Sequence, residues 1–385
     1  MSFKRLFSRS LDAMPERLHL AAHSHHLWPD ASFDGQQQAW LDAAHLADRK
    51  WDEVMDEVWP EAQRHVAAEL GVTADRIVFA SNTHDFLIRL FAAVPAQGPV
   101  RILTSDGEFH SARRQFARWE EAGLARVTRV SAEPFDSFSE RFIDAAAVGG
   151  HDLILVSRVL FNSGRIFEHS ERLAALARPE GPWVVIDGYH AFMAIENPLP
   201  ETTAETAFYL GGGYKYAMAG EGCAFMHCPP GFGPRPPVTG WFAEFGDLTA
   251  PPGSSVGYRC DAMRFMGATF DPSALYRFNA VQRMLRAEEL TTAAISAHVA
   301  ALQQRLLGAI AATPLAEACL LNPLTGGAHA RFLAFRAAKA ADWNAQLMAA
   351  NCIADVRGDV LRVGLAIYHD EADIEAFGAL AGQLA

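Results

Sequence analysis

The chain has 385 residues, of which 50% are hydrophobic and 20% are charged, a composition typical of a globular enzyme of two or three domains. Its formal net charge of -12 and its pI of about 5.7 argue against nucleic-acid or anionic-membrane partners, because both need basic surfaces. No stretch reaches the ~18 uninterrupted apolar residues of a membrane span, and the N-terminus lacks the apolar core of a secretory signal. The five cysteines are scattered without paired spacing, which predicts free thiols in a cytoplasmic protein.

The N-terminal segment, residues 1–30, carries four histidines at His19, His23, His25 and His26. A zinc site is disfavoured there, because no second cluster of ligands and no HExxH motif completes it. We therefore expect an N-terminal arm without a metal.

Five short apolar runs downstream are typical of buried strands. They are residues 77–80, 100–103, 153–157, 183–186 and 207–210. Helical patterns surround them, beginning with residues 32–70, which Gly71 is expected to end. This alternation predicts an α/β fold with a largely parallel sheet, which binds ligands at the carboxyl ends of its strands.

The turn after the first strand leads directly into a helix and suits a phosphate group, because free backbone N–H groups and the positive end of the helix dipole converge there. The candidate residues are Asn82, Thr83 and His84. An ordinary helix cap by Asn82, Thr83 or Asp85 explains the same residues equally well.

Two later strands end in residues that suit a cofactor. One strand ends at Asp187, with His190 three residues later, and the other leads through three glycines to Lys215 between Tyr214 and Tyr216. Glycines remove side chains that would block a bulky planar cofactor. Taken singly, the lysine is a solvated surface residue and the aspartate a helix cap. Taken together they favour pyridoxal phosphate (PLP), whose Schiff base needs a lysine and whose pyridine nitrogen needs a carboxylate.

The stretches Asp187-Gly188-Tyr189-His190 and Gly213-Tyr214-Lys215-Tyr216 resemble the centre of the class V aminotransferase superfamily of fold type I, in particular its kynureninase branch. The resemblance extends from about residue 18 to residue 374. It implies a large PLP-binding domain at residues 31–270, with a mostly parallel seven-stranded sheet, and a smaller α+β domain at residues 271–385. It also implies an amino-acid substrate and a homodimer with shared active sites.

The resemblance assigns roles to individual residues of this chain. The residues implied to bind PLP are Asn82, Thr83, His84, Phe109, Asn162, Asp187, His190, Tyr214, Lys215, Trp241 and Thr269. Among them Phe109 is expected to stack on the pyridine ring, and Trp241 and Thr269 to reach the site of the neighbouring subunit. Lys215, Tyr214 and Asp187 are the catalytic candidates.

The resemblance also points to substrate-binding residues. Arg362 is expected to hold the substrate α-carboxylate through two parallel hydrogen bonds. The N-terminal arm, with His23 and Ser24, is expected to line the substrate pocket. The histidine-rich arm and the missing aspartate after Phe109 depart from the kynureninase pattern, and this leaves the identity of the substrate open.

The reaction that the resemblance implies is hydrolytic cleavage of a carbon–carbon bond in a kynurenine-type substrate. A class V aminotransferase acting on another amino acid stays open, because it needs the same residues. A cysteine desulfurase or selenocysteine lyase is disfavoured, because no cysteine follows Arg357 and Gly358. A PLP-fold binding module without catalysis is the non-enzymatic alternative.

Overall fold

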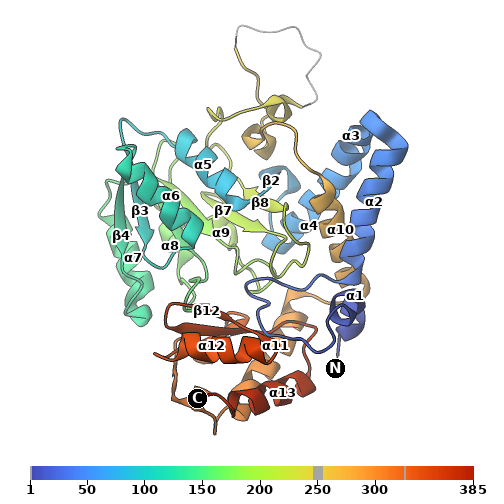
Figure 1. The fold of residues 1–385 in the computed structure, drawn as a ribbon. Coiled ribbons are helices and arrows are strands. Elements are labelled where there is room, and N and C mark those ends of the chain that lie inside the picture. Colours follow the sequence, from blue (N-terminus) through green and yellow to red (C-terminus); the bar gives the residue numbers. More distant parts are fainter. Residues whose placement is uncertain (1, 246–254, 325–326) are drawn as a thin grey trace.

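The computed structural model describes residues 2–245, 255–324 and 327–385. The chain forms a large sheet between helices, with a smaller sheet and its helices lying below it in the view of Figure 1. The predicted α/β architecture is confirmed. No helix of the described residues is long and apolar enough to cross a membrane.

Among the described residues, seven strands form the central sheet in the order β2-β8-β7-β6-β5-β3-β4. The strands are β2 (Ile77–Ala80), β3 (Val100–Ser105), β4 (Ala125–Val130), β5 (Leu153–Ser157), β6 (Trp183–Asp187), β7 (Ala207–Gly212) and β8 (Ala224–His227). Strand β8 runs antiparallel to both of its neighbours, and the other neighbouring pairs are parallel. The prediction of a mostly parallel sheet is therefore confirmed.

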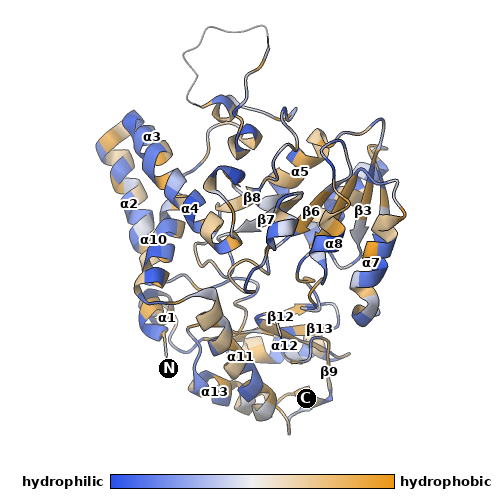
Figure 2. Cartoon of the chain, turned by 180° about the vertical axis from the view of Figure 1, so that it is seen from behind, coloured by the Kyte–Doolittle hydropathy of each residue, from blue (hydrophilic) through white to orange (hydrophobic). Residues whose placement is uncertain are grey.

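The central strands are apolar along their whole length because helices cover both faces of the sheet. All residues of β5 are buried, and β6 is buried up to Asp187. Figure 2 shows the hydrophobic residues concentrated in these strands, whereas the surrounding helices carry both colours. Strand β4 was not predicted, because it lies at the sheet edge, where only Ala125 is buried and polar residues such as Arg126 and Arg129 are exposed.

Helices on the N-terminal side form a packed column beside the sheet (Figure 1). They are α2 (Asp30–Leu46), α3 (Lys50–Glu53), α4 (Trp59–Leu70) and α10 (Ser273–Ala287). The single helix expected over residues 32–70 is interrupted, because Ala47 takes a positive φ of 53° and Val54–Val58 form a π-helical turn. Gly71 ends α4 in the left-handed conformation (φ 68°), as predicted.

The remaining helices flank the strands or belong to the C-terminal part. They are α1 (Ser8–Asp12), α5 (Thr83–Ala93), α6 (His110–Glu121), α7 (Phe138–Ala147), α8 (Ser170–Ala174), α9 (Glu201–Ala204), α11 (Thr292–Ala309), α12 (Ala340–Ala349) and α13 (Glu371–Ala381). Helix α5 packs on β2, β7 and β8, and α6 and α7 pack on β4.

The C-terminal part is built on a second, antiparallel sheet in the order β12-β13-β10-β9. Its strands are β9 (Cys319–Leu320), β10 (Phe332–Arg336), β12 (Asp355–Arg357) and β13 (Val360–Gly364). The N-terminal arm joins this part, because β1 (Leu18–His19) pairs in parallel with β11 (Cys352–Ile353). Figure 1 accordingly shows the blue arm beside the red C-terminal elements. The domain boundaries at residues 30 and 270 stay a prediction.

Candidate active site

A cavity of about 450 Å³ lies at the carboxyl edge of the central sheet. Loops after β2, β3, β5, β6 and β7 supply its wall, because parallel strands present their carboxyl ends along one edge. The lining residues are Ser81, Asn82, Thr83, His84, Phe109, Ser111, Ser157, Val159, Phe161, Asp187, Tyr189, His190, Tyr214, Lys215, Glu221 and Gly222. The structure thus brings together eight of the residues singled out in the sequence, including Lys215 and Asp187.

Lys215 is the central cation of this cavity. Its Nζ lies 5.4 Å from the ring centroid of Tyr189 and 5.8 Å from that of Phe109, and it forms a hydrogen bond with His190 Nε2. Burial, reinforced by the charge of Arg362, lowers the pKa of Lys215 to about 7. The amine therefore exchanges a proton near neutral pH and has an unprotonated fraction available for covalent chemistry.

Asp187 faces the cavity from the end of β6. Its Oδ1 accepts a hydrogen bond from Tyr189 N at 3.0 Å, and burial raises its pKa. A second carboxyl group, Glu108, lies behind the wall with only 1% of its surface exposed. Ser105 Oγ donates to Glu108 Oε1 at 2.5 Å, and Ser157 Oγ donates to its other oxygen. Burial, with the nearby charge of Asp187, raises the pKa of Glu108 to about 7.

The start of α5 forms another part of the wall. Asn82 is the helix cap, since its Oδ1 accepts a hydrogen bond from Asp85 N at 3.0 Å. Thr83 and His84 follow in the first turn, and His84 Nδ1 is buried without a hydrogen-bond partner among the described residues. A helix start with an unsatisfied polar atom suits an anionic group. The capping and phosphate interpretations therefore apply to the same turn.

At two of the three glycines before Lys215, the missing side chain makes room for protein groups. A Cβ at Gly211 would lie 2.5 Å from the ring of Phe225, and one at Gly212 would lie 2.6 Å from Tyr189 Oη. The expectation that these glycines keep space free for a cofactor is wrong for both positions, because protein side chains fill that space. Gly212 allows the Tyr189 ring to approach Lys215.

Arg362 does not line the cavity. It is 1% exposed; its Nη1 donates to Phe161 O at 2.6 Å and its Nη2 pairs with Asp355. Asp355 also pairs with Arg357 Nη1 at 2.6 Å. Burial lowers the pKa of Arg362. In this structure the guanidinium is engaged by protein groups, so its role toward a substrate carboxylate stays a prediction.

Five further candidates lie outside the cavity wall, and one of them, Asn162, lines a neighbouring cavity instead. His23 is fully buried, stacks on Phe332 with 4.7 Å between ring centroids, and lies 3.7 Å from Asp355. Ser24 donates its backbone N–H to Ala21 O in a turn of the arm. Trp241 Nε1 donates to Thr269 Oγ1 at 3.3 Å, and both residues are exposed at the surface. Their predicted contact with a neighbouring subunit stays a prediction.

Sequence reasoning missed two residues of this region. His25 Nδ1 lies 3.1 Å from Tyr214 Oη, so the arm reaches the cavity through His25, although His23 and Ser24 were expected to do so. Glu108 was not singled out, although it follows a buried strand directly before Phe109. The signal was a carboxylate placed beside a predicted ligand-binding strand end. In the described residues, no three His, Cys, Asp or Glu side chains are grouped as metal ligands.

Solved structures share this fold over nearly the whole chain. The cysteine desulfurase of Thermococcus onnurineus NA1 superposes with a TM-score of 0.78 at 18% identity, covering 100% of this chain and 99% of that protein. A C-DES mutant with glycine covalently linked to the PLP cofactor gives a TM-score of 0.80 at 13% identity, covering 98% and 99%. The Escherichia coli cysteine desulfurase CsdA gives 0.79 at 14%, covering 99% and 97%. The chain has the fold of fold-type-I PLP enzymes.

Sequence comparison gives relatives of higher identity that match only part of the chain. The isopenicillin N epimerase of Streptomyces clavuligerus is 29% identical over 240 residues, which are 57% of this chain and 59% of that protein. The isopenicillin N epimerase of Amycolatopsis lactamdurans is 29% identical over 209 residues, 52% of this chain and 48% of that protein. The chain thus spans about half the length of the curated relatives it matches. No family model matches the sequence.

A fold-type-I architecture by itself does not select a reaction. None of the relatives named above is a kynureninase, so the kynureninase branch stays a prediction. The expectation that a cysteine desulfurase is disfavoured is not borne out, because the solved structures that share this fold include cysteine desulfurases.

Proposed function

We propose that this protein is a PLP-dependent enzyme that acts on an α-amino acid through Lys215. The observation that carries the proposal is a lysine with a pKa of about 7 in a cavity at the carboxyl edge of the sheet, with a carboxylate at the end of a neighbouring strand. Strongly perturbed amines in such cavities are characteristic of covalent catalysis. The fold, shared with a C-DES mutant that carries PLP, supports the same assignment.

The residues present fit PLP. Asp187 would hold the pyridine nitrogen, and its buried carboxylate is matched to a positively charged partner. Phe109 would offer its ring to the flat face of the cofactor, and its exposed fraction of 41% leaves that face open. The start of α5, with the unsatisfied His84 Nδ1, would hold the phosphate. When bound, PLP supplies an electron sink for bonds at the substrate Cα.

The protein's own groups would then carry the proton transfers. Lys215 Nζ, once released by the substrate, is suited to take and return the Cα proton because its pKa lies near neutrality. His190 would orient that amine through its hydrogen bond, and burial keeps the imidazole neutral by lowering its pKa. Tyr214 Oη, held by His25, is the further candidate for proton relay.

The motifs favour kynureninase-like hydrolysis, in which Lys215 removes the Cα proton before a side-chain carbon–carbon bond is cleaved. Epimerisation at Cα is the second candidate, and the two epimerase relatives favour it. Both reactions begin with loss of the same proton. They differ in whether that proton returns to the opposite face or a side-chain bond breaks. Transamination by the same residues is the third outcome to test.

The first experiment is the visible absorption spectrum of the protein mixed with PLP. The expected result is a yellow protein whose band disappears in Lys215→Ala. Borohydride reduction followed by peptide mass spectrometry should place the cofactor on Lys215, which is one of only four lysines in the chain. A protein that stays colourless, or PLP located on another lysine, would contradict the proposal.

The second experiment separates the reactions with one set of amino acids in D2O. Release of anthranilate from kynurenine would support hydrolysis. Deuterium at Cα with loss of optical purity would support epimerisation, and conversion of PLP to pyridoxamine phosphate would support transamination. The exposed Lys339, replaced by alanine, is the matched control for the lysine substitution.

We also propose a homodimer that places Trp241 and Thr269 beside the partner's site. Trp241 is 40% exposed, and its hydrogen bond to Thr269 links two surface segments into one patch. Large exposed aromatic residues are typical of interfaces. Sedimentation of the wild type should give a dimer, and Trp241→Ala should weaken both dimerisation and PLP affinity. A fully active monomer would overturn the proposal.

A further inference from the structure

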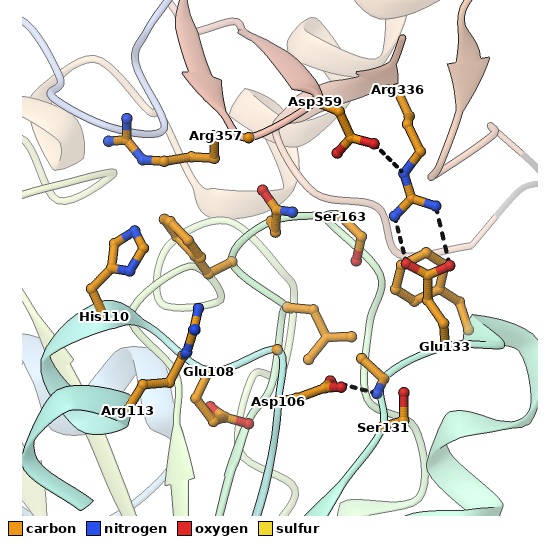
Figure 3. Close-up of a pocket in the computed structure, with 17 residues that line it drawn as sticks. Asp106, Glu108, His110, Arg113, Ser131, Glu133, Ser163, Arg336, Arg357 and Asp359 are labelled. Atoms are coloured by element: carbon orange, nitrogen blue, oxygen red, sulfur yellow. Dashed lines mark hydrogen bonds and ion pairs between the residues drawn. The ribbon is translucent and has the colours of Figure 1, made fainter. Parts of the chain in front are cut away.

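A second cavity of about 400 Å³ adjoins the candidate active site, and Phe161 belongs to both walls. We call it the side chamber. It lies between the start of α6, the loops after β4 and β5, and the turn between β12 and β13 (Figure 3). Its lining residues are Asp106, Gly107, Glu108, His110, Arg113, Ser131, Ala132, Glu133, Phe135, Leu160, Phe161, Asn162, Ser163, Arg336, Arg357, Gly358 and Asp359.

The carboxylates of the side chamber are already engaged by protein groups. Glu133 forms a two-pronged ion pair with Arg336, whose Nε also lies 3.7 Å from Asp359. Asp106 Oδ1 accepts a hydrogen bond from Ala132 N at 2.7 Å. Glu108, described above, is satisfied by two serine hydroxyls. Each of these acidic side chains thus already has a partner within the protein.

The opposite side of the chamber is basic and less engaged. His110, Arg113 and Arg357 lie along it in Figure 3. Within the described ranges, no carboxylate lies within ion-pair distance of Arg113 or His110. Arg357 pairs with Asp355 through Nη1 at 2.6 Å, but its Nε is buried without a hydrogen-bond partner. Burial and then the charges of Arg113, Arg357 and Arg362 lower the pKa of His110, which places several cations around one point. Helix α6 starts there at His110 without a side-chain cap, which adds its positive dipole end.

We propose that the side chamber receives the side chain of the amino-acid substrate and that His110, Arg113 and Arg357 bind a negatively charged group at its end. This inference rests on the proposed function, because it requires an amino acid held at Lys215 in the adjoining cavity. From there a side chain that passes Phe161 enters the chamber. The substrate class is then α-amino acids with an anionic side-chain terminus, since guanidinium groups pair best with carboxylates.

The experiment measures binding rather than turnover. The PLP-loaded wild type is titrated at fixed ionic strength with aspartate, glutamate and 2-aminoadipate, and with neutral asparagine, glutamine and norleucine. The dissociation constant is read from the change of the PLP spectrum and repeated by calorimetry. Each acidic amino acid is compared with the neutral one of similar length. For the pair whose length fits the chamber best, we expect the acidic ligand to bind about tenfold tighter or more.

Arg113→Gln is the variant that tests the basic side, because Arg113 is exposed and its removal does not leave a buried partner charge. It should lose most of the tenfold preference for the acidic ligand while the affinity for the neutral ligand stays unchanged. Arg113→Lys should keep part of the preference. Arg114→Gln, on the same helix but outside the chamber lining, is the matched control and should keep all of it.

Each result has a separate meaning. Equal affinity for acidic and neutral ligands would overturn the inference while leaving the proposed function intact. Equal weakening of both ligands by Arg113→Gln would also overturn it, because the effect would then be structural. A protein that takes up no PLP would overturn the proposed function and with it this inference.

Discussion

Two clusters of buried charge lie close together in this protein, and they differ in what neutralises them. Around Lys215 the amine and the carboxylate of Asp187 face an open cavity. Around Arg362 the carboxylate of Asp355 pairs with Arg362 and Arg357, and His23 lies against it. Charge left open in a cavity is available to a ligand, whereas charge paired inside the protein holds elements together. The first cluster is therefore the candidate for chemistry, and the second joins the N-terminal arm to the C-terminal sheet.

The largest expected effect comes from the open cluster. Lys215→Ala should abolish the covalent PLP band and lower turnover by on the order of a thousandfold or more, because no other amine lines the described wall. Turnover is compared with that of Lys339→Ala, which should behave like the wild type. Retained activity in Lys215→Ala would show that the open cluster around Lys215 does not carry the chemistry.

Substitutions in the paired cluster around Arg362 should lower the free energy of unfolding. Asp355→Asn leaves two guanidinium groups without their common carboxylate, and the Arg362 partner is almost fully buried. We expect the free energy of unfolding, measured in urea, to be about 3–5 kcal/mol lower than in the wild type. Asp359→Asn, in the turn that follows β12 and with a side chain 61% exposed, is the matched control and should change little. If both variants had the same stability, the buried pair of Asp355 and Arg362 would not be what stabilises this region.

Glu108 should make the stability of the folded protein depend on pH. Its pKa is raised from an ordinary 4.5 to about 7, so the folded protein holds a proton that the unfolded chain releases above pH 4.5. Stability from this group is present below pH 4.5 and is lost as the pH rises to about 7. Glu108→Gln should remove this loss, which amounts to at most about 3 kcal/mol.

Urea unfolding of the PLP-free protein at several pH values measures this effect. The stability of Glu108→Gln relative to the wild type should rise between pH 4.5 and 7 and then stay level. Glu121→Gln, at the exposed end of α6, controls for the substitution itself. A constant difference across the pH range would mean that folding does not raise the pKa of Glu108.

The smallest expected effect concerns the contact between the arm and the cavity. Tyr214→Phe removes the hydrogen bond to His25 and should destabilise the docked arm by about 1 kcal/mol, seen as faster amide exchange in residues 18–29. His25→Ala removes the same bond but keeps the tyrosine hydroxyl. A fall in kcat confined to Tyr214→Phe would assign the hydroxyl a chemical role, and equal kcat in both variants would leave it a purely structural one.

Local sequence patterns were sufficient for the α/β layering. The runs that became β5 and β6 are apolar throughout because a strand covered on both faces must be, and that property is visible in the residues themselves. Gly71 was predictable for the same kind of reason, since a left-handed residue at a helix end favours glycine. The presence of Asp187 and Lys215 in one cavity followed from strand ends that meet along one edge of a parallel sheet.

Tertiary structure alone decided which charges are open and which are paired. Arg362 was expected to face a substrate, but β12 brings Asp355 to it across the antiparallel pair with β13, and that pairing depends on register. His25 reaches Tyr214 because the arm docks on β11, which lies over 300 residues away in the chain. Sequence thus determined which residue types end the strands, whereas long-range packing determined their partners, because a charge is neutralised by whatever the fold places beside it.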